Sequence, residues 1–370
     1  MASEQRLRSE IGKLVKNGVS EGAYCGAVAV VARGGASLYL KAFGQASVLP
    51  LPEKMRYDML FDVASMTKVV ATTTSIMTLV DRGKISMDDK AAEVVPEFGV
   101  NGKDRVTVFD LLTHTSGLTD WADPYTRHST RRDVIREICS LGLAYPPGKS
   151  VLYSDLGFMI LGELVERVSG EVLDRYAHRR VFEPLGMEDT MFNPSKRLAK
   201  RCVPTEYSNW RLKIVRGEVH DENAFAMEGV SGHAGLFSTA SDLARFAMML
   251  CYGGEAGGTR VLSPESVDLM AMDHTRGLNE SRGLGWLVMP EFAEGTRIWK
   301  IGHNGYTGVS MVVSLEKKAF AALLTNRVHP VREGRIPGDK SVGIMMERKR
   351  RWTEYLPKFY QLAETLVGGE

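Results

Sequence analysis

Segments with β-strand character lie at both ends of this chain, and this placement constrains the fold more than any other feature. Near the N-terminus, two such segments flank Gly34-Gly35, a pair that is typical of a hairpin turn. The C-terminal part carries further short β-type runs, and the sequence between is mostly helical in pattern. The β-type runs are residues 23–33, 37–43, 284–289, 297–301, 309–315 and 320–325. We therefore expect an α+β fold with one antiparallel sheet built from both termini.

Amphipathic helices are expected at the two chain ends, and they would cover this sheet. They comprise residues 1–16 and 353–367. Further helices are expected at residues 69–82, 108–113, 131–141, 155–168, 172–181 and 241–250. Residues 187–213 are harder to assign and are expected to hold short strands. This pattern predicts a sheet domain from residues 1–83 and 276–370, with a mostly helical domain, residues 84–275, inserted between the two parts.

Composition excludes several classes of function. The 370 residues carry a formal net charge of +2, which gives no electrostatic case for binding nucleic acid. No run reaches the roughly 18 apolar residues that a membrane-spanning helix requires. The first helix has no apolar signal core, so we expect a cytoplasmic protein, or a periplasmic or secreted one if an export segment has been trimmed. The sequence leaves the oligomeric state open.

A Ser-x-x-Lys motif, Ser65 to Lys68, stands at the start of the helix expected over residues 69–82, which Gly83 ends. Spacing of i and i+3 places a hydroxyl and an amine on one helix face. Burial lowers the pKa of a lysine, so Lys68 is a candidate base that activates Ser65. The helix N-terminus adds N–H groups that favour an oxyanion. The alternative is a helix-capping serine beside a solvated lysine.

Two further motifs occur at informative places. Tyr153-Ser154-Asp155 directly precedes an amphipathic helix, where a loop tyrosine can point into a cleft and exchange protons. The alternative is a packed tyrosine followed by a capping Ser154 or Asp155. The segment Gly302 to Gly308 falls in a strand of the C-terminal sheet, and its glycines allow another backbone or a substrate to approach closely. The alternative is a simple β-turn at Asn304-Gly305.

The order and spacing of these three motifs resemble the penicillin-recognising serine hydrolases. This group contains class C β-lactamases, D-alanyl-D-alanine carboxypeptidases and the β-lactamase-like family VIII carboxylesterases. The resemblance covers approximately residues 11–326 and implies an active site between the sheet and the helical domain. Three other segments add to it: Leu111 to Leu118 (LLTHTSGL), Pro147-Gly148 followed by Tyr153-Ser154, and Gly235 to Ala244 (GLFSTASDLA).

The resemblance implies a role for each matching residue. Ser65 would be the acylated nucleophile, and Lys68 and Tyr153 would transfer protons, with the division between them left open. The main-chain N–H groups of Ser65 and Tyr306 would form an oxyanion hole. Asp155, His303, Asn304 and Gly305 would contact the substrate. No metal or other cofactor is implied.

Two residues depart from the pattern of the family. Asp155 stands where asparagine is common, so an amide donor to the substrate is missing unless the carboxyl is protonated or turned away. His303 stands where lysine is common, and we expect its charge to change with pH around the ordinary histidine value of about 6.5. A fixed charge for a substrate carboxylate is therefore weakened. Some carboxypeptidases and esterases of the family also carry histidine here.

Two other patterns compete with this assignment. Gly18 to Gly22 fits Gly-x-Ser-x-Gly around Ser20, but the segment leads from a helix to a strand, whereas a nucleophile elbow needs strand, turn and helix. His220-Asp221-Glu222, with His233 downstream, has no compact metal spacing, so we interpret it as a loop lining the cleft or a hydrogen-bonded cluster. His114 is interpreted as structural.

The sequence therefore predicts a metal-independent serine hydrolase that cleaves small-molecule esters or amides through an acyl-serine intermediate. A carboxylesterase-like or D-amino-acid peptidase-like activity is favoured, because a cell-wall enzyme or β-lactamase is normally exported. A class C-like β-lactamase is the second hypothesis. A penicillin-binding ligand sensor with little turnover is the third, and intact Ser65, Lys68 and Tyr153 argue against it.

Overall fold

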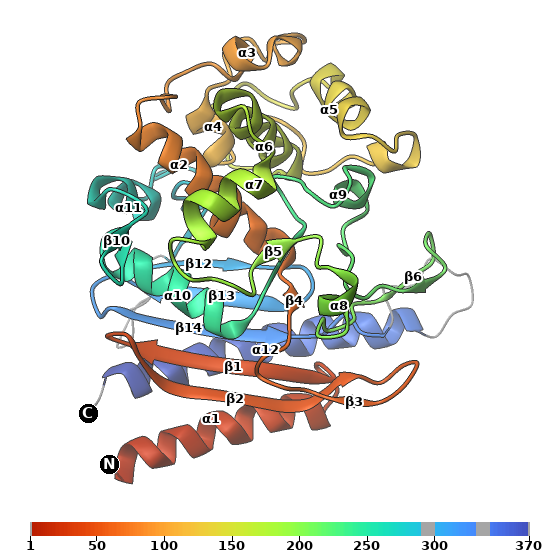
Figure 1. The fold of residues 1–370 in the computed structure, drawn as a ribbon, viewed down its shortest axis with the longest axis vertical. Coiled ribbons are helices and arrows are strands. Elements are labelled where there is room, and N and C mark those ends of the chain that lie inside the picture. Colours follow the sequence, from red (N-terminus) through yellow and green to blue (C-terminus); the bar gives the residue numbers. More distant parts are fainter. Residues whose placement is uncertain (1, 290–299, 331–340, 369–370) are drawn as a thin grey trace.

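The computed structural model describes residues 2–289, 300–330 and 341–368, and only the backbone of residues 341–349. Its main sheet has seven strands in the order β11-β12-β13-β14-β1-β2-β3 (Figure 1). Strands β1 and β14 pair antiparallel, with Val28 opposite Leu324, so the two ends of the chain meet in the sheet as predicted. The strands are β1 Gly26–Arg33, β2 Ala36–Ser47, β3 Glu53–Lys54, β11 Leu287–Val288, β12 Ile301–Asn304, β13 Val309–Ser314 and β14 Ala319–Thr325.

The hairpin between β1 and β2 follows from its glycine pair. Gly34 and Gly35 have φ angles of 58° and 83°, a region that glycine enters without the clash of a Cβ atom. Two positive φ angles in a two-residue turn match the right-handed twist of the flanking strands. Arg33 then lies opposite Ala36 in the β1–β2 pair, and the register of this pair shifts once, between Val31 and Ala32. The strand expected at residues 297–301 begins at Ile301, and residues 297–299 lie outside the described residues.

Each face of the sheet is covered by helices. Along β1, side chains alternate between the two faces, as the period of a strand requires. Ala27, Ala29 and Val31 pack with helices α1 (Ala2–Ser20) and α12 (Ser341–Gly368), which lie together on one face (Figure 1). Val28 and Val30 belong to the large core on the other face, with α10 (Ala240–Cys251). The expected terminal helices are therefore confirmed, and α12 begins earlier than predicted.

The helix that carries the Ser-x-x-Lys motif is not regular. It begins as a 3₁₀ turn (Ala64–Met66), continues as a π-helix (Lys68–Thr73), and becomes α2 (Thr74–Asp81). The Thr74 hydroxyl donates to the carbonyl of Val69, five residues back. Gly83, with φ 62°, follows the end of the helix as expected. Local π-geometry is often found at functional sites, because it shifts side chains relative to a straight helix.

Most of the remaining elements lie above the sheet in Figure 1, in the same part of the molecule as this helix. The helices are α3 Ala91–Val94, α4 Val108–Leu112, α5 Arg131–Ser140, α6 Asp155–Ser169, α7 Leu173–Ala177, α8 Lys196–Ala199, α9 Glu222–Ala226 and α11 Pro264–Ala271, and a 3₁₀ turn covers Pro124–Thr126. The short strands are β4 Phe61–Asp62, β5 Met191–Phe192, β6 Tyr207–Ser208, β7 Lys213–Ile214, β8 Leu236–Ser238, β9 Glu255–Ala256 and β10 Thr259–Arg260. Strand β8 pairs with β4 and β5, and it was not predicted.

The division of the chain into a sheet domain and an inserted helical domain, at residues 83/84 and 275/276, stays a prediction. Within the described ranges, no helix combines the length and apolar content needed to cross a membrane.

Candidate active site

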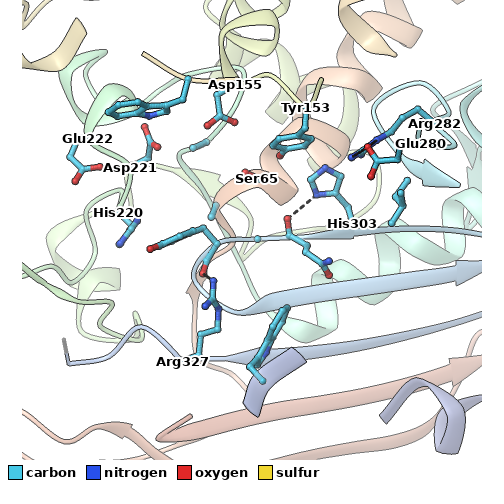
Figure 2. A pocket seen from close by; sticks show the side chains of 18 residues that line it. Ser65, Tyr153, Asp155, His220, Asp221, Glu222, Glu280, Arg282, His303 and Arg327 are labelled. Atoms are coloured by element: carbon cyan, nitrogen blue, oxygen red, sulfur yellow. Dashed lines mark hydrogen bonds and ion pairs between the residues drawn. The ribbon is translucent and has the colours of Figure 1, made fainter. Parts of the chain in front are cut away.

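A pocket of about 530 Å³ opens where the end of β12 meets the turn that carries Ser65. Figure 2 shows Ser65 between Tyr153 and Asp155 on one side and the strand of His303 on the other. The predicted site residues that line the pocket are Ser65, Tyr153, Asp155, His303, Asn304, Gly305 and Tyr306. Lys68 does not line it, because its side chain is fully buried beside Ser65. One pocket therefore gathers residues that lie up to 241 positions apart in the sequence.

The turn before Ser65 has an unusual backbone. Ala64 has φ 46°, in the left-handed region that a residue with a side chain enters only at a cost of about 1 kcal/mol. The Asp62 carboxylate accepts the N–H of Ala64 at 2.8 Å, and the Thr67 hydroxyl donates to the Ala64 carbonyl at 2.7 Å. These two hydrogen bonds hold the turn in a conformation that it would not adopt in isolation. They fix the direction in which Ser65 faces the pocket.

Lys68 is held by three partners. Its Nζ donates to Ser65 Oγ at 3.0 Å and to the carbonyl of His233 at 3.1 Å, and it lies 2.7 Å from Asp155 Oδ1. Burial of Lys68 opposes its charge, but Asp155 and Tyr153 outweigh burial, so the pKa of Lys68 is raised above its usual value. The expectation of a lowered pKa for Lys68 is therefore wrong, because burial lowers it by less than Asp155 and Tyr153 raise it. In the resting site Lys68 is an ammonium, paired with the carboxylate that replaces the common asparagine.

Tyr153 is positioned by the loop between α4 and α5. Its ring packs on the ring of His114, with 4.6 Å between the centroids, and Lys68 Nζ lies 4.9 Å from the Tyr153 ring centre. The His114 Nδ1 accepts the N–H of Ser154 at 3.0 Å, and the Ser154 hydroxyl caps α6. Burial and the charges of Arg282 and Lys68 hold the pKa of His114 well below its usual value. His114 is thus neutral and has a structural role, as interpreted from the sequence. The alternative that Ser154 caps the following helix is also correct.

The strand side of the pocket carries His303 and Asn304. His303 is 5% exposed, and its Nδ1 lies 2.9 Å from the carbonyl of Asn304. Burial, with the positive charges of Lys68 and Arg282, lowers the pKa of His303 well below its usual value. The expected titration around pH 6.5 is therefore corrected: the imidazole is neutral throughout the physiological range. The Asn304 amide oxygen accepts from the Ser310 hydroxyl at 2.5 Å, which fixes that side chain.

Gly305 lets the strand approach the Ser65 turn closely. A Cβ atom at Gly305 would lie 2.3 Å from the carbonyl oxygen of Val63, a distance that no side chain tolerates. Beyond it, the Thr307 hydroxyl donates to the carbonyl of Asp62 at 2.8 Å. The backbone around Tyr306 is therefore fastened next to the turn that carries Ser65. The β-turn alternative for Asn304-Gly305 holds in part, because Asn304 ends β12 and the chain turns directly afterwards.

Asp62 joins three parts of the site, and sequence reasoning missed it. One carboxylate oxygen accepts from Ala64, and the other accepts the N–H of His220 at 2.6 Å. The carbonyl of the same residue accepts from Thr307. Burial raises the pKa of Asp62, although these hydrogen bonds oppose the change. The Ser65 turn, the loop after Val219 and the strand side of the pocket are thus held by one residue.

Two arginines on the pocket wall also lacked a sequence signal. Arg282 donates through Nε and Nη2 to Glu280 at 2.9 and 2.8 Å, and its guanidinium lies 5.3 Å from the Tyr153 ring centre. Arg327 lies between the rings of Tyr306 and Trp352. Figure 2 shows Arg282 near His303, and Arg327 on the far side of the strand from Tyr153. Both come from loops whose sequence has no distinguishing pattern.

The loop at His220 lines the pocket, as expected, through His220, Asp221 and Glu222. The structure also brings Asp221 and His233 together, with 2.9 Å between Oδ1 and Nε2. With Asp155 they form three possible ligands whose atoms lie within 4.8 Å of one another. The contact between Asp221 and His233 agrees with the hydrogen-bonded cluster interpreted from the sequence, whereas the proximity of Asp155 to them was not predicted. Lys68 Nζ lies 2.7 Å from Asp155 Oδ1, so this carboxylate already has a cationic partner from the protein.

Comparison with known proteins agrees with this fold and pocket. The beta-lactamase family model matches residues 11–341. The chain is 32% identical to the N-acetylmuramyl-L-alanine amidase of Bacillus subtilis (strain 168), over 88% of this chain and 82% of the relative. It is also 32% identical to an Escherichia coli (strain K12) protein provisionally named D-alanyl-D-alanine carboxypeptidase, over 79% of this chain and 76% of the relative.

Solved structures share the architecture. The hydrolase EstCE1, which has promiscuous acyltransferase activity, superimposes with a TM-score of 0.73 at 23% identity, covering 94% of this chain and 99% of that one. The octameric penicillin-binding protein homologue of Pyrococcus abyssi gives a TM-score of 0.72 at 24% identity, covering 86% and 73%. These similarities support the fold, and the family match extends over most of the chain. The protein therefore belongs to the beta-lactamase family and is a serine hydrolase of the β-lactamase and penicillin-binding protein superfamily.

Proposed function

We propose that the protein hydrolyses small amides and esters through an acyl intermediate on Ser65. The observation that carries this proposal is the 3.0 Å contact between Lys68 Nζ and Ser65 Oγ at the floor of the pocket. In this position the Ser65 hydroxyl can be reached by a substrate, and the hydrogen bond from the charged Lys68 holds it in place. Its backbone is fastened by Asp62, so little reorganisation is needed before attack.

The raised pKa of Lys68 favours Tyr153 over Lys68 as the group that accepts the proton of Ser65. Lys68 keeps its positive charge in the resting enzyme, so the base would be the phenolate form of Tyr153, a charge that the neighbouring ammonium favours. This phenolate takes the proton from Ser65 as Oγ attacks the carbonyl carbon. Tyr153 then returns this proton to the departing amine or alcohol, and the carbonyl carbon keeps its bond to Ser65. In the second half of the reaction, water attacks the carbonyl carbon of the ester on Ser65. The proton of this water passes through Tyr153 to Ser65 Oγ, and the acid product leaves.

The oxyanion of each tetrahedral intermediate would be bound by the main-chain N–H groups of Ser65 and Tyr306. Two features support this placement: the close approach at Gly305, and the hydrogen bond from Thr307 to Asp62. Preorganised donors of this kind contribute on the order of 3 kcal/mol each to transition-state binding. Asp155, His303, Asn304 and Gly305 would contact the rest of the substrate.

Amides of peptidoglycan type are the first candidate substrates. The Bacillus relative is named for the amide bond between N-acetylmuramic acid and L-alanine, and the Escherichia relative for the D-alanyl-D-alanine bond. A class C-like β-lactamase activity is less favoured, because Asp155 is tied to Lys68 and the neutral His303 offers no charge to a carboxylate. A ligand sensor would be acylated without turnover.

A substrate panel tests the proposal. The wild type and Ser65→Ala are compared on p-nitrophenyl acetate, N-acetylmuramyl-L-alanine, a D-alanyl-D-alanine peptide and nitrocefin. We expect multiple turnovers by the wild type on the ester and on at least one amide, and none above background by Ser65→Ala. Turnover that stops after one equivalent would favour the sensor instead. Unchanged hydrolysis by Ser65→Ala would refute the proposal.

A further inference from the structure

Four aromatic side chains lie together at the edge of the pocket, and the proposed chemistry does not use them. They are Trp121, Tyr125, Trp210 and Phe225, here called the aromatic ledge. Ring centroids are 6.4 Å apart for Trp121 and Tyr125, 5.2 Å for Tyr125 and Trp210, and 5.7 Å for Trp210 and Phe225. The ledge is exposed: Trp121 by 42%, Trp210 by 47% and Phe225 by 38%. Grouped exposed aromatic rings on a protein surface mark a binding site more often than scattered ones do.

The ledge is continuous with the pocket, because Trp121 lines both. It is also built on the loop that forms the pocket wall. Arg211 packs its guanidinium on Phe225, 4.1 Å from the ring centre, and donates to the carbonyls of Val219 at 2.6 Å and His220 at 3.0 Å. A ligand that extends out of the pocket past Trp121 would therefore meet the ledge next.

The main chain that carries Trp121 and Tyr125 is held by hydrogen bonds to the buried side chain of Asn223. Asn223 is 1% exposed, and its amide accepts the N–H of Tyr125 at 3.2 Å and donates to the carbonyl of Ala122 at 2.9 Å. This residue joins α9 to the segment that carries Trp121 and Tyr125. The ledge is thus a preorganised surface from three parts of the chain, which reduces the entropy lost when a ligand binds.

The chemistry of the ledge fits a sugar ring better than an apolar chain. The guanidinium of Arg211 lies over the rings of Trp210 and Phe225, and Asp221, whose side chain is 22% exposed, lines the pocket together with Trp121. A hexopyranose offers the matching combination, since its C–H faces are apolar and its hydroxyls and N-acetyl group form hydrogen bonds. Tryptophan and tyrosine suit such ligands because each combines a large flat face with a polar atom.

We infer that the aromatic ledge binds the N-acetylated sugar of an amide substrate whose scissile bond lies at Ser65. This inference rests on the proposed function and narrows its substrate class to sugar-linked amides of the muramyl type. The Bacillus relative, named for such an amide, is consistent with this class. The sugar would stack on Trp210 and Trp121 while the amide carbonyl enters the pocket.

The test compares two substrates with the same scissile bond. N-acetylmuramyl-L-alanine carries the sugar, and O-methyl-D-lactoyl-L-alanine lacks it. The measured quantity is the ratio of kcat/KM for the first substrate to kcat/KM for the second. We expect Trp210→Ala to lower this ratio by about tenfold, the effect of losing one or two aromatic contacts, mainly through KM. Trp210→Phe should retain most of the ratio.

Tyr252→Ala is the matched control, since it removes another exposed aromatic residue, 43% exposed, whose ring faces Lys318 instead of the ledge. It should leave the ratio unchanged. An equal loss on both substrates in Trp210→Ala would overturn the inference, because the change would then act on the pocket itself. A loss confined to p-nitrophenyl esters with long acyl chains would overturn it in favour of an apolar ligand. A dimer of the wild type that Trp210→Ala dissociates would overturn it in favour of self-association.

Binding separates this inference from the proposed function. Ser65→Ala is titrated with N-acetylmuramyl-L-alanine, and tryptophan fluorescence is followed. Saturable binding that Trp210→Ala weakens about tenfold supports the ledge, even if the wild type cleaves no amide. Cleavage of both substrates with no effect of Trp210→Ala on the ratio or on binding refutes the ledge and leaves the proposed function standing.

Discussion

The two walls of the pocket differ in whether their titratable groups are charged. On the helix wall, made of Ser65, Tyr153 and Asp155 with Lys68 buried behind them, the ammonium of Lys68 is paired with a carboxylate 2.7 Å away. On the strand wall, made of His303, Asn304, Gly305 and Tyr306, the one titratable base is kept neutral by burial and by the neighbouring cations. In the proposed mechanism, the charge that takes part in proton transfer is therefore confined to the helix wall. The strand wall contributes its shape and its main-chain groups, and its position depends on Gly305.

The largest effect is expected on the helix wall. Lys68→Ala and Tyr153→Phe should each lower kcat by at least about a hundredfold, the usual scale for losing a proton-transfer group. The double variant should lose much less than the product of the two, because the groups act as one unit. Single-turnover acylation by p-nitrophenyl acetate measures this directly. Near-normal acylation by Tyr153→Phe would assign the proton transfer to another group.

On the strand wall, Gly305→Ala should lower kcat by about a hundredfold, on the scale of losing one oxyanion donor. The new Cβ would meet the Val63 carbonyl at 2.3 Å and push the strand from the Ser65 turn. Gly302→Ala, within β12 and three residues before Gly305, is the control. Its nearest neighbour is the flexible end of Met289, at 2.7 Å, which can move. Equal losses in the two variants, with equal changes in melting temperature, would mean that Gly305 serves only the fold.

A smaller effect concerns the pH profile of the helix wall. The charge of Asp155 helps to raise the pKa of Lys68, so Asp155→Asn should lower that pKa. Activity that needs the ammonium is present below the pKa of Lys68 and is lost as pH rises through it. The alkaline limb of kcat/KM should therefore move to lower pH in Asp155→Asn. Asp221→Asn removes a nearby carboxylate that does not pair with Lys68, and it should leave that limb in place.

The smallest effect is expected from titration of His303. Since its pKa lies well below the usual value, its charge should not change across about pH 6 to 8. The ratio of kcat/KM for a carboxylate-bearing peptide to that for a neutral ester should then vary by less than about twofold in this range, in the wild type and in His303→Gln alike. A ratio that falls as pH rises through about 6.5, and does so only in the wild type, would show that the imidazole gains a proton when substrate binds.

The sequence predicted the parts of the molecule that depend on local pattern. Short continuous runs of apolar residues predicted β1 and β14, the glycine pair predicted the first hairpin, and Gly83 marked the end of the motif helix. The spacing of Ser65 and Lys68 on one helix face required only helical geometry. Strand β8 was missed because it is three residues long and pairs only through tertiary contacts with β4 and β5.

Properties that depend on distant partners were not predictable in the same way. The pKa of Lys68 is raised by Asp155, which lies 87 positions further along the chain. The direction of the shift is therefore opposite to the one expected from burial alone. Asp62 looks like any acidic residue in the sequence, and its role follows from the N–H groups of Ala64 and His220 that surround it. The aromatic ledge likewise joins residues whose proximity has no local signal.

Covalent labelling tests the central claim, acylation of Ser65, most directly. The wild type is treated with a fluorophosphonate, digested, and the labelled peptide is sequenced by mass spectrometry. One adduct per chain on Ser65, absent from Ser65→Ala and formed much more slowly in Lys68→Ala, is the predicted result. An adduct on Ser20, or equal labelling of Ser65→Ala, would contradict the account.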